Sequence, residues 1–343
     1  MKKLIAASFL TLTLVACNKE NKANSDKENV NTEATTSQTS TEEKLPEVKA
    51  AISDSAGVYT LHYQLEKGKT YPFVLVQKDV QTVSMEGKSQ SQTNETTDKV
   101  AFKVNDVQNG VYDLDVIFQS KKQSGTAMGK TISVDTNAAE PKDESLKIFW
   151  KVNKAMMGNQ VSMKMDDTGK IISITGFDPI YKKVETALQS AIKDANERKA
   201  IMQGFKQGFN EEALKLQFKT NLSLFPQKGL KIGESFSESI NLTEDGKLKN
   251  TTTFTLAKVD NGVAEITIKG GIPKKSDKQS QNGITATMSI EGVQTGTLKL
   301  DTKTGWMGAS TMTMTSHQSQ KLSDGTKSQT STQKTVSTTK INP

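Results

Sequence analysis

The stretch VNDVQNGVYDLDVIF, residues 104–118, shows in its simplest form the pattern that recurs through most of this chain. Apolar and polar side chains alternate on both sides of Asn109-Gly110, the dipeptide that a two-residue hairpin turn favours. The stretch therefore predicts two antiparallel strands joined by a tight turn. LAKVDNGVAEITIKG, residues 256–270, repeats this pattern around Asn261-Gly262.

A second pair of segments repeats in the same order. MKMDDTGKIISITG (163–176) and LKLDTKTGWMGAST (298–311) each place an aspartate and Thr-Gly between two strand-like runs. Repetition of two hairpins in the same order indicates a duplicated unit. We therefore expect an α+β fold, mainly antiparallel β. It would consist of a duplicated strand-rich module with long hairpins and a helical segment between the two halves.

Two regions have helical rather than alternating spacing. Residues 143–158 repeat apolar side chains at intervals of three and four, between a capping Asp143 and a terminating Gly158. A second helical region is predicted to begin at Asp178-Pro179, with Asp178 as its cap. The expected organisation is a first β-rich module with one helix at 56–177, a helical bridge at 178–222 and a second β-rich module at 223–343.

The N-terminal residues have the pattern of a secreted lipoprotein. Two lysines precede an apolar run that is too short to span a bilayer, since a spanning helix needs roughly 20 apolar residues. The four residues Leu14-Val15-Ala16-Cys17 resemble a bacterial lipobox. The sequence thus predicts a signal peptide at 1–16 and lipidation of Cys17, whose acyl chains (palmitate among them) would anchor the protein in a membrane.

Residues 17–55 are predicted to form the lipidated cysteine and a disordered tether, because they are polar and carry few large apolar side chains. Asn18 follows the cysteine at the position where inner-membrane lipoproteins of Gram-negative bacteria carry aspartate. The expected location is therefore the outer membrane, facing either the periplasm or the cell surface. Asp54-Ser55-Ala56 resembles the O-glycosylation acceptor of exported Bacteroidota proteins, so Ser55 is a candidate glycosylation site.

The charge of the chain does not indicate a nucleic-acid partner. The formal net charge is +7, but Arg198 is the single arginine and the remaining basic residues are lysines. Base and phosphate readers depend heavily on the bidentate fork of arginine. The scattered lysines are typical of a solvated surface, so we expect no binding to nucleic acid.

Short motifs with catalytic associations are better explained by turns. Asp167-Thr168-Gly169 matches the triplet of aspartic proteases, but the second copy, Asp301-Thr302-Lys303, breaks the pair of facing aspartates that such enzymes need. Residues 125–131 fall one residue short of a phosphate-binding loop and precede no helix. With two histidines and one cysteine, the chain offers no set of zinc ligands. We therefore predict a non-enzymatic protein with no catalytic residues, no metal and no cofactor.

Apolar residues of the predicted helices are the candidates for a binding cleft against the sheet. The residues that would line it are Phe149, Trp150, Met156, Met157, Ile180, Val184, Leu188 and Ile192. The alternative is that these side chains simply pack the helices onto the sheet, which is the commoner role of an amphipathic helix.

The lipobox, the Ser/Thr/Lys-rich tether and the duplicated hairpins together resemble an uncharacterised family of Bacteroidota outer-envelope lipoproteins. A more distant resemblance is to half-barrel envelope lipoproteins that bind lipid. These resemblances imply an outer-membrane-anchored lipoprotein that binds a lipid or another apolar ligand in a sheet–helix cleft. The alternative is a surface-exposed structural or protein-interaction module with an envelope or surface protein as partner, which the polar strands expected at 88–99 and 326–340 favour.

Overall fold

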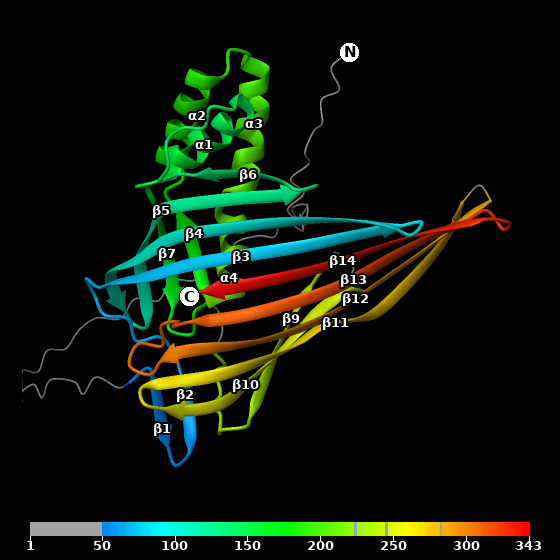
Figure 1. Cartoon of the computed structure of the whole chain (residues 1–343). Helices are drawn as coiled ribbons and strands as arrows, with labels where there is room; N and C mark the ends of the chain where they lie inside the picture. The colour runs from blue at the N-terminus through cyan, green and yellow to red at the C-terminus, as the bar shows by residue number, and fades with distance from the viewer. Residues whose placement is uncertain (1–49, 223–224, 244–245, 282) are drawn as a thin grey trace, which may run out of the picture.

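The computed structural model describes residues 50–222, 225–243, 246–281 and 283–343 (Figure 1). The strands of this part of the chain are β1 (Ile52–Ser55), β2 (Val58–Leu61), β3 (Thr70–Met85), β4 (Lys88–Gln108), β5 (Val111–Ala127), β6 (Lys130–Asp135), β7 (Gln160–Asp166), β8 (Ile171–Thr175), β9 (Ser235–Asn241), β10 (Lys249–Asp260), β11 (Val263–Gln281), β12 (Ile284–Asp301), β13 (Ser310–Ser323) and β14 (Ser328–Ile341). The helices are α1 (Glu144–Met156), α2 (Asp178–Ala191), α3 (Ala195–Gly208) and α4 (Glu211–Leu222).

One antiparallel sheet contains all the described strands except β1 and β2. Its strand order is β8-β7-β5-β4-β3-β14-β13-β12-β11-β10-β9, and β6 pairs with the distal part of β5. The chain builds one half outwards from β3 to β8 and the other half inwards from β9 to β14. The last strand, β14, then pairs with β3 and joins the halves, with Ile341 opposite Leu75. The expected mainly antiparallel α+β fold, with helices between two strand groups, is confirmed.

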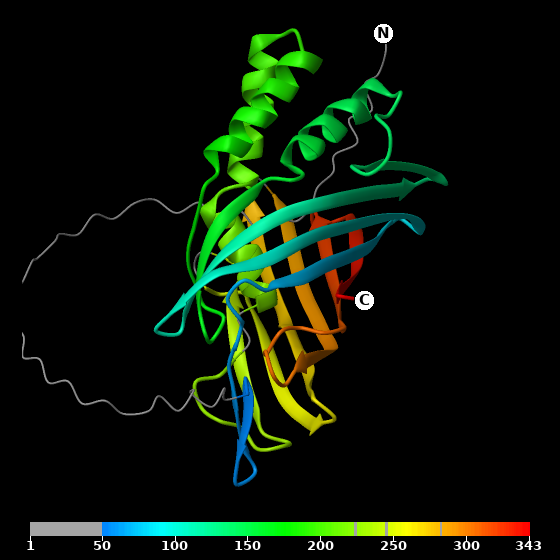
Figure 2. The same cartoon turned by 90° about the vertical axis from the view of Figure 1, so that its left-hand side faces the viewer.

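The sheet is curved, and α4 lies inside the curve (Figure 2). Helices α1, α2 and α3 stand beyond the edge formed by β5 and β6 (Figure 1). The large buried side chains of the strands, such as Phe102, Leu114 and Ile266, belong to one hydrophobic core. We call the face of the sheet that carries this core the concave face, and the opposite face the convex face.

The two Asn-Gly hairpins form as the sequence predicts. Asn109 and Gly110 join β4 to β5 with φ angles of 52° and 75°, and Asn261 and Gly262 join β10 to β11 with 50° and 77°. Both turns therefore have positive φ at two successive residues, the geometry that fits the right-handed twist of paired strands.

The helix boundaries partly agree with the sequence pattern. The side chain of Asp143 caps α1 by accepting from the backbone N–H groups of Ser145 and Leu146, as expected. The prediction that Asp178 caps the next helix is wrong, because Phe177 is the N-cap and Asp178 is the first helical residue. Asp178 instead places its charge in the first turn of α2, where the helix dipole favours an acidic side chain.

Three hairpins, β3–β4, β11–β12 and β13–β14, extend well beyond the part of the sheet that α4 covers (Figure 1). Most residues at their tips are exposed on both faces. Hydroxyl pairs link neighbouring strands there, with 2.8 Å between Thr82 Oγ1 and Ser91 Oγ. We call these three extensions the arms. The polar strand expected at 88–99 lies within β4, and β14 contains residues 328–340 of the one expected at 326–340.

Among the described residues, regular structure is present before the predicted tether boundary at residue 55. Ala51 has no exposed surface, and Ile52–Ser55 form β1, which pairs with β2. The cause is local, since the backbone N–H groups of Ala51 and Ile52 donate to carbonyls of the turn after β12. Ser55 is exposed at the end of β1. Cys17, the predicted signal peptide and residues 18–49 of the tether lie outside the described residues.

Candidate functional site

The duplicated Asp/Thr-Gly turns meet on the segment between β2 and β3. The backbone N–H of Tyr63 donates to the carbonyl of Asp167 at 2.6 Å, and that of Gln64 donates to the carbonyl of Thr304 at 2.9 Å. One turn comes from each half of the sheet. The repeat detected in the sequence therefore holds the segment 62–64 from two sides.

The leading carboxylate of each turn is occupied by its own backbone. Asp166 Oδ1 accepts from the N–H groups of Thr168 and Lys170 at 3.0 and 2.9 Å. Asp301 Oδ1 accepts from those of Lys303 and Thr304 at 3.0 and 2.8 Å. These bonds have the form expected of an aspartate that stabilises a turn.

The eight apolar residues proposed to line a sheet–helix cleft do not gather around one cavity. Four of them belong to the core and are at most 5% exposed: Ile180, Val184, Leu188 and Ile192. Met156 and Met157 are partly buried and pack against the core. Trp150 is half-buried, and Phe149 is 52% exposed. The indole N–H of Trp150 donates to the carbonyl of Asp135 at 3.0 Å, which ties α1 to the end of β6. Leu188 also borders an open, mostly polar depression of about 680 Å³ between α2 and α3.

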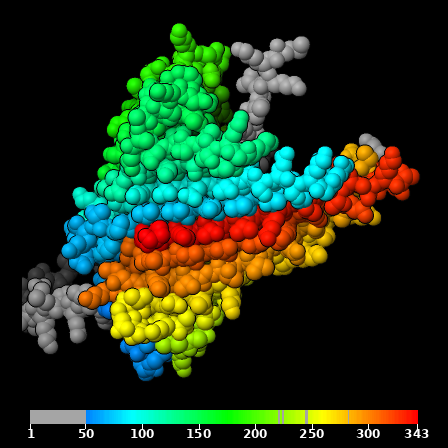
Figure 3. All heavy atoms as spheres, in the orientation of Figure 1, coloured from blue at the N-terminus to red at the C-terminus, as the bar shows by residue number. Residues whose placement is uncertain are grey.

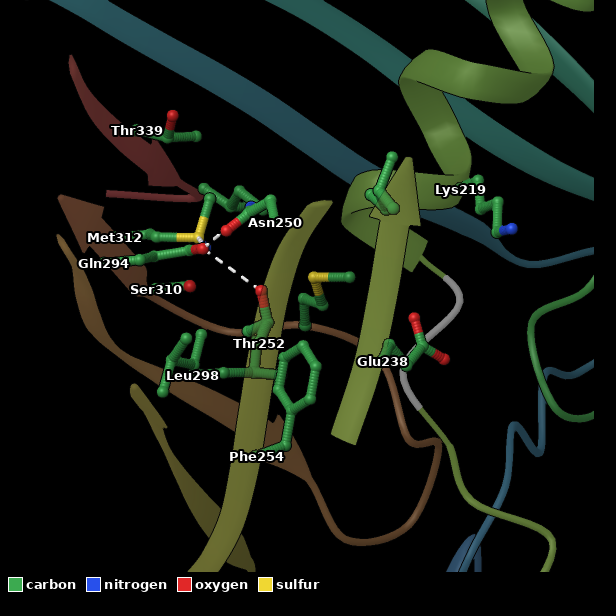
Figure 4. Close-up of a pocket in the computed structure, with 14 residues that line it drawn as sticks. Lys219, Glu238, Asn250, Thr252, Phe254, Gln294, Leu298, Ser310, Met312 and Thr339 are labelled. Carbon is green, nitrogen blue, oxygen red and sulfur yellow. Dashed lines mark hydrogen bonds between the residues drawn. The ribbon is translucent and has the colours of Figure 1, made fainter. Parts of the chain in front are cut away.

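A smaller cavity of about 70 Å³ lies on the concave face, between α4 and the second half of the sheet (Figure 4). Its lining comes from α4, from the six strands β9 to β14, and from the turn after β12: Lys219, Glu238, Ile240, Asn250, Thr252, Phe254, Ile268, Gln294, Leu298, Met307, Ser310, Met312, Thr339 and Ile341. Seven of these fourteen residues have aliphatic, aromatic or thioether side chains and seven are polar or charged, but apolar atoms form most of the surface that lines the cavity. An apolar lining with a few polar atoms is the usual composition of a small-molecule pocket.

A buried amide organises the polar part of the cavity. Gln294 is 6% exposed, and its Oε1 accepts from Asn250 Nδ2 at 3.2 Å and from Thr252 Oγ1 at 3.1 Å (Figure 4). Its Nε2 donates to the sulfur of Met312 at 2.6 Å. Asn250 Oδ1 is buried and has no hydrogen-bond partner among the described residues. A donor on a bound molecule or a water would satisfy this oxygen.

One carboxylate faces the same cavity from the edge strand β9. Burial raises the pKa of Glu238, and the positive charge of Lys219 on α4 partly offsets this effect. Glu238 lies between Phe236 and Ile240 on the concave side of β9. These two neighbours lie opposite Phe254 and Asn250 of β10, respectively. A charge that points inward from an edge strand also discourages the strand from pairing with another chain.

An apolar row continues from the cavity along the concave face towards the arms. The register of the strands places Met312 opposite Gly296 and Met314 opposite Gln294. Ile272 lies opposite Gly292. Ile290 and Met288 continue the row along β12 itself. A Cβ atom on Gly292 would lie 2.5 Å from Met314 Cε and 3.5 Å from Ile272 Cδ1, so these two side chains meet over the glycine. We call the row formed by Met312, Met314, Ile272, Ile290 and Met288 the concave trough.

Sequence reasoning missed both the cavity and the trough. The signal for them was the unusual density of glycine inside strands, at Gly270-Gly271 of β11 and at Gly292 and Gly296 of β12. Glycine within a strand pattern indicates a bend, a bulge or a close approach of another group. Met312 is partly buried and packs against the core.

None of the described helices is long and apolar enough to cross a membrane. Among the described residues, no three His, Cys, Asp or Glu side chains are grouped as a metal ion would require.

The sequence matches the family described as "Family of unknown function (DUF6263)" over residues 109–307. No curated protein matches it. The prediction of an uncharacterised family is confirmed, whereas the assignment to Bacteroidota lipoproteins stays a prediction.

Two solved structures are weakly similar to this chain. A structure of lipid–protein interactions in lipovitellin is similar at 12% identity and a TM-score of 0.37, over 81% of this chain and 25% of that one. The crystal structure of Pseudomonas aeruginosa OccK5 (OpdH) is similar at 8% identity and a TM-score of 0.18, over 80% and 99% of the two chains. The chain spans about a quarter of the lipovitellin chain. Both scores are too low to support an argument about function.

Proposed function

The chain belongs to a family of unknown function, DUF6263. We propose that it is a lipid-anchored envelope protein that holds an acyl chain of a lipid in its concave trough. The anchor is Cys17, and the location is the outer membrane, as the lipobox and Asn18 predict. The activity is binding without chemistry at the ligand.

The observation that carries this proposal is the continuity between the cavity and the trough. The apolar row from Met312 to Met288 follows eight residues of β12, which corresponds to roughly 27 Å of strand. An extended acyl chain is long, narrow and unbranched, and a row of this shape matches it. Each methylene group removed from water contributes about 0.8 kcal/mol.

The size of the cavity limits how the ligand lies. Its volume of about 70 Å³ is roughly half that of an engineered cavity of ~150 Å³ that binds benzene. The cavity therefore accommodates the end of an acyl chain, and the rest of the chain lies along the open trough. The apolar groups around the cavity favour the methyl end of the chain there, with the polar end towards the arms.

The position of the tether supports a carrier that reaches away from its anchor. Backbone N–H groups of Ala51 and Ile52 bond to Lys303 and Thr302, in the turn that joins β12 to β13 at the end opposite the arms. β12 contains 18 residues, and a strand of that length spans roughly 60 Å. The open end of the trough consequently lies far from the point where the anchored segment enters.

The test is a titration of the chain from residue 17 onwards, carrying Cys17→Ser, with a fluorescent fatty acid. Met314→Glu introduces a charge into the trough and is expected to lower the affinity at least ten-fold, because burying a carboxylate against an acyl chain is costly. Val293→Glu is the matched control, since Val293 is 65% exposed on the convex face of the neighbouring strand.

Saturable binding that Met314→Glu weakens and Val293→Glu leaves unchanged would support the proposal. Absence of saturable binding, or equal loss in both variants, would refute it. Native mass spectrometry of the same protein from a bacterial periplasm provides a second readout, in which a lipid lost on denaturation is expected.

A further inference from the structure

No described helix or strand covers the convex face of the sheet over β3, β14, β13 and β12. These strands run as uninterrupted bands across the surface in Figure 3. A sheet face of this extent is left open to solvent only when its side chains are polar or when it meets a partner. The identity of its side chains therefore decides what the face contacts.

The strand register assigns the charged side chains of this face. From Val74 of β3 and Thr297 of β12 outwards, the convex side of β3, β4 and β11–β14 presents seven lysines and two glutamates: Lys78, Lys99, Lys269, Lys278, Lys321, Lys334 and Lys340, with Glu95 and Glu291. We call these nine residues the basic face. All seven lysines are exposed, and none of them forms a salt bridge within the described part of the chain.

Within the basic face Lys78 lies opposite Glu95, and the other six lysines have no acidic residue opposite them. Towards the tether end of the same face, positive and negative charges are matched. Lys299 lies opposite Glu265, and Lys103 lies opposite Asp115. The excess of positive charge is thus confined to the middle of the sheet and the arms. A local excess of this kind attracts an anionic partner.

Hydroxyl groups lie in regular rows between the lysines, together with the valines Val76, Val80, Val293 and Val336. Thr255, Thr267, Thr297 and Thr311 lie side by side on four neighbouring strands, and Lys340 continues their row. Neighbouring strands are roughly 4.8 Å apart. The row is therefore a closely spaced array of short hydrogen-bonding side chains with a lysine at its end.

The chemistry of the basic face disfavours a protein or a sugar as partner. Its strands place their aromatic residues, such as Phe73 and Phe102, on the concave side. Protein interfaces are enriched in aromatic residues and arginine and depleted in lysine and serine, and sugar or base stacking needs aromatic rings. Lysine and hydroxyl groups together suit phosphate oxygens.

We propose that the basic face docks on an anionic phospholipid bilayer. The lysines occupy five of six adjacent strands, so the charge is spread in two dimensions, as the phosphates of a lipid surface are. A linear polyanion would be matched better by a single stripe. Each lysine near an anionic bilayer contributes a roughly five-fold gain in binding.

Vesicle co-sedimentation tests the proposal with the chain from residue 17 onwards carrying Cys17→Ser, so that the lipid anchor plays no part. The expected result is binding to vesicles of phosphatidylcholine and phosphatidylglycerol, weak binding to phosphatidylcholine alone, and loss of binding in high salt. The triple variant Lys78→Gln, Lys334→Gln, Lys340→Gln is expected to bind at least ten-fold more weakly.

The matched control is Lys182→Gln, Lys193→Gln, Lys199→Gln, which changes the net charge equally at exposed positions in or beside α2 and α3. Equal loss of binding in both triple variants, or equal binding to both kinds of vesicle, would overturn the proposal. Binding to dextran sulfate without binding to vesicles would overturn it as well, because the partner would then be an anionic polymer. Fatty-acid binding in solution should persist in both variants, so failure of the trough and failure of the basic face are distinguishable.

Discussion

The hydroxyl of Tyr63 donates a 3.0 Å hydrogen bond to the carbonyl oxygen of Leu222, which lies 159 residues later in the chain. Tyr63 has no exposed surface, and Leu222 is the last residue of α4. This bond ties the helix inside the curve of the sheet to the segment that the two duplicated turns hold. Leu222 O is also one of the terminal carbonyls that α4 itself leaves without a helical partner.

Replacing Tyr63 with Phe should destabilise the protein without altering its fold. The substitution keeps the ring, which packs against Phe225 at 4.8 Å between centroids, and leaves the carbonyl of Leu222 unsatisfied in the core. We expect the free energy of unfolding to fall by about 1–3 kcal/mol, measured by urea denaturation. Tyr59→Phe is the control, because the hydroxyl of Tyr59 has no hydrogen-bond partner among the described residues. An equal effect of the two substitutions would contradict the assigned role.

Alkaline pH should destabilise the protein through the same residue. Burial raises the pKa of Tyr63, and of Tyr71, Tyr112 and Tyr181, above the ordinary value of 10.0. Below pH 10 both the folded and the unfolded protein keep these protons. Above it the unfolded state releases them first, so the free energy of unfolding falls as pH rises. Urea denaturation between pH 8 and about 11 should show this decline, and Tyr63→Phe should make it shallower; an unchanged slope in the variant would contradict the prediction.

Much of this fold is predictable because its turns are local. Asn109-Gly110 and Asn261-Gly262 need only their own sequence to select positive φ angles, and the alternating strands beside them follow. Asp143 caps α1 by the same local logic. Asp178 does not cap α2, because the chain is already helical at Phe177, whose φ and ψ are −75° and −29°.

The sequence pattern predicts neither the pairing of β14 with β3 nor the concave trough. β14 and β3 are separated by most of the chain, and nothing in either strand specifies the other. The stripe of α2 shows the same limit, since spacing identifies Ile180 and Val184 as an apolar face but does not distinguish a filled core from a cleft. In the structure both are fully buried.

The glycines of β11 should prove essential to the curvature of the sheet. Gly271 has a φ of 141°, and a Cβ atom there would collide with the carbonyl of Gly292 on the neighbouring strand. Gly271→Ala is expected to lower the free energy of unfolding by about 2–4 kcal/mol. Gly204→Ala is the control, because nothing lies within 4 Å of its added methyl group in α3, and it should stabilise by about 0.5–1 kcal/mol. Thermal unfolding of the two variants gives the comparison, and similar melting temperatures would refute the claim.

Neutralising Glu238 should stabilise the protein at neutral pH. Because burial raises its pKa above 4.5, the folded state keeps the proton to higher pH than the unfolded state does. Ionisation therefore lowers the free energy of unfolding as pH rises through this range. Glu238→Gln should be more stable than the parent at pH 7 and equal to it near pH 3, as followed by urea denaturation. Glu185→Gln on the exposed side of α2 is the control, and a gain for Glu238→Gln that did not vary with pH would contradict the assignment.

The last prediction concerns the orphaned oxygen in the cavity. Asn250 Oδ1 is buried without a partner among the described residues, so removing it costs no hydrogen bond at that atom. Asn250→Leu gives up the amide donor to Gln294, which still accepts from Thr252 at 3.1 Å, and it makes the cavity more apolar. We expect a change in stability of less than about 1.5 kcal/mol and a several-fold higher affinity for the fluorescent fatty acid. Asn250→Asp keeps the shape but buries a charge, so it should weaken both stability and binding. If Asn250→Leu instead weakened binding of the fatty acid, the polar end of the ligand would lie in the cavity, and the orientation inferred for the acyl chain would be wrong.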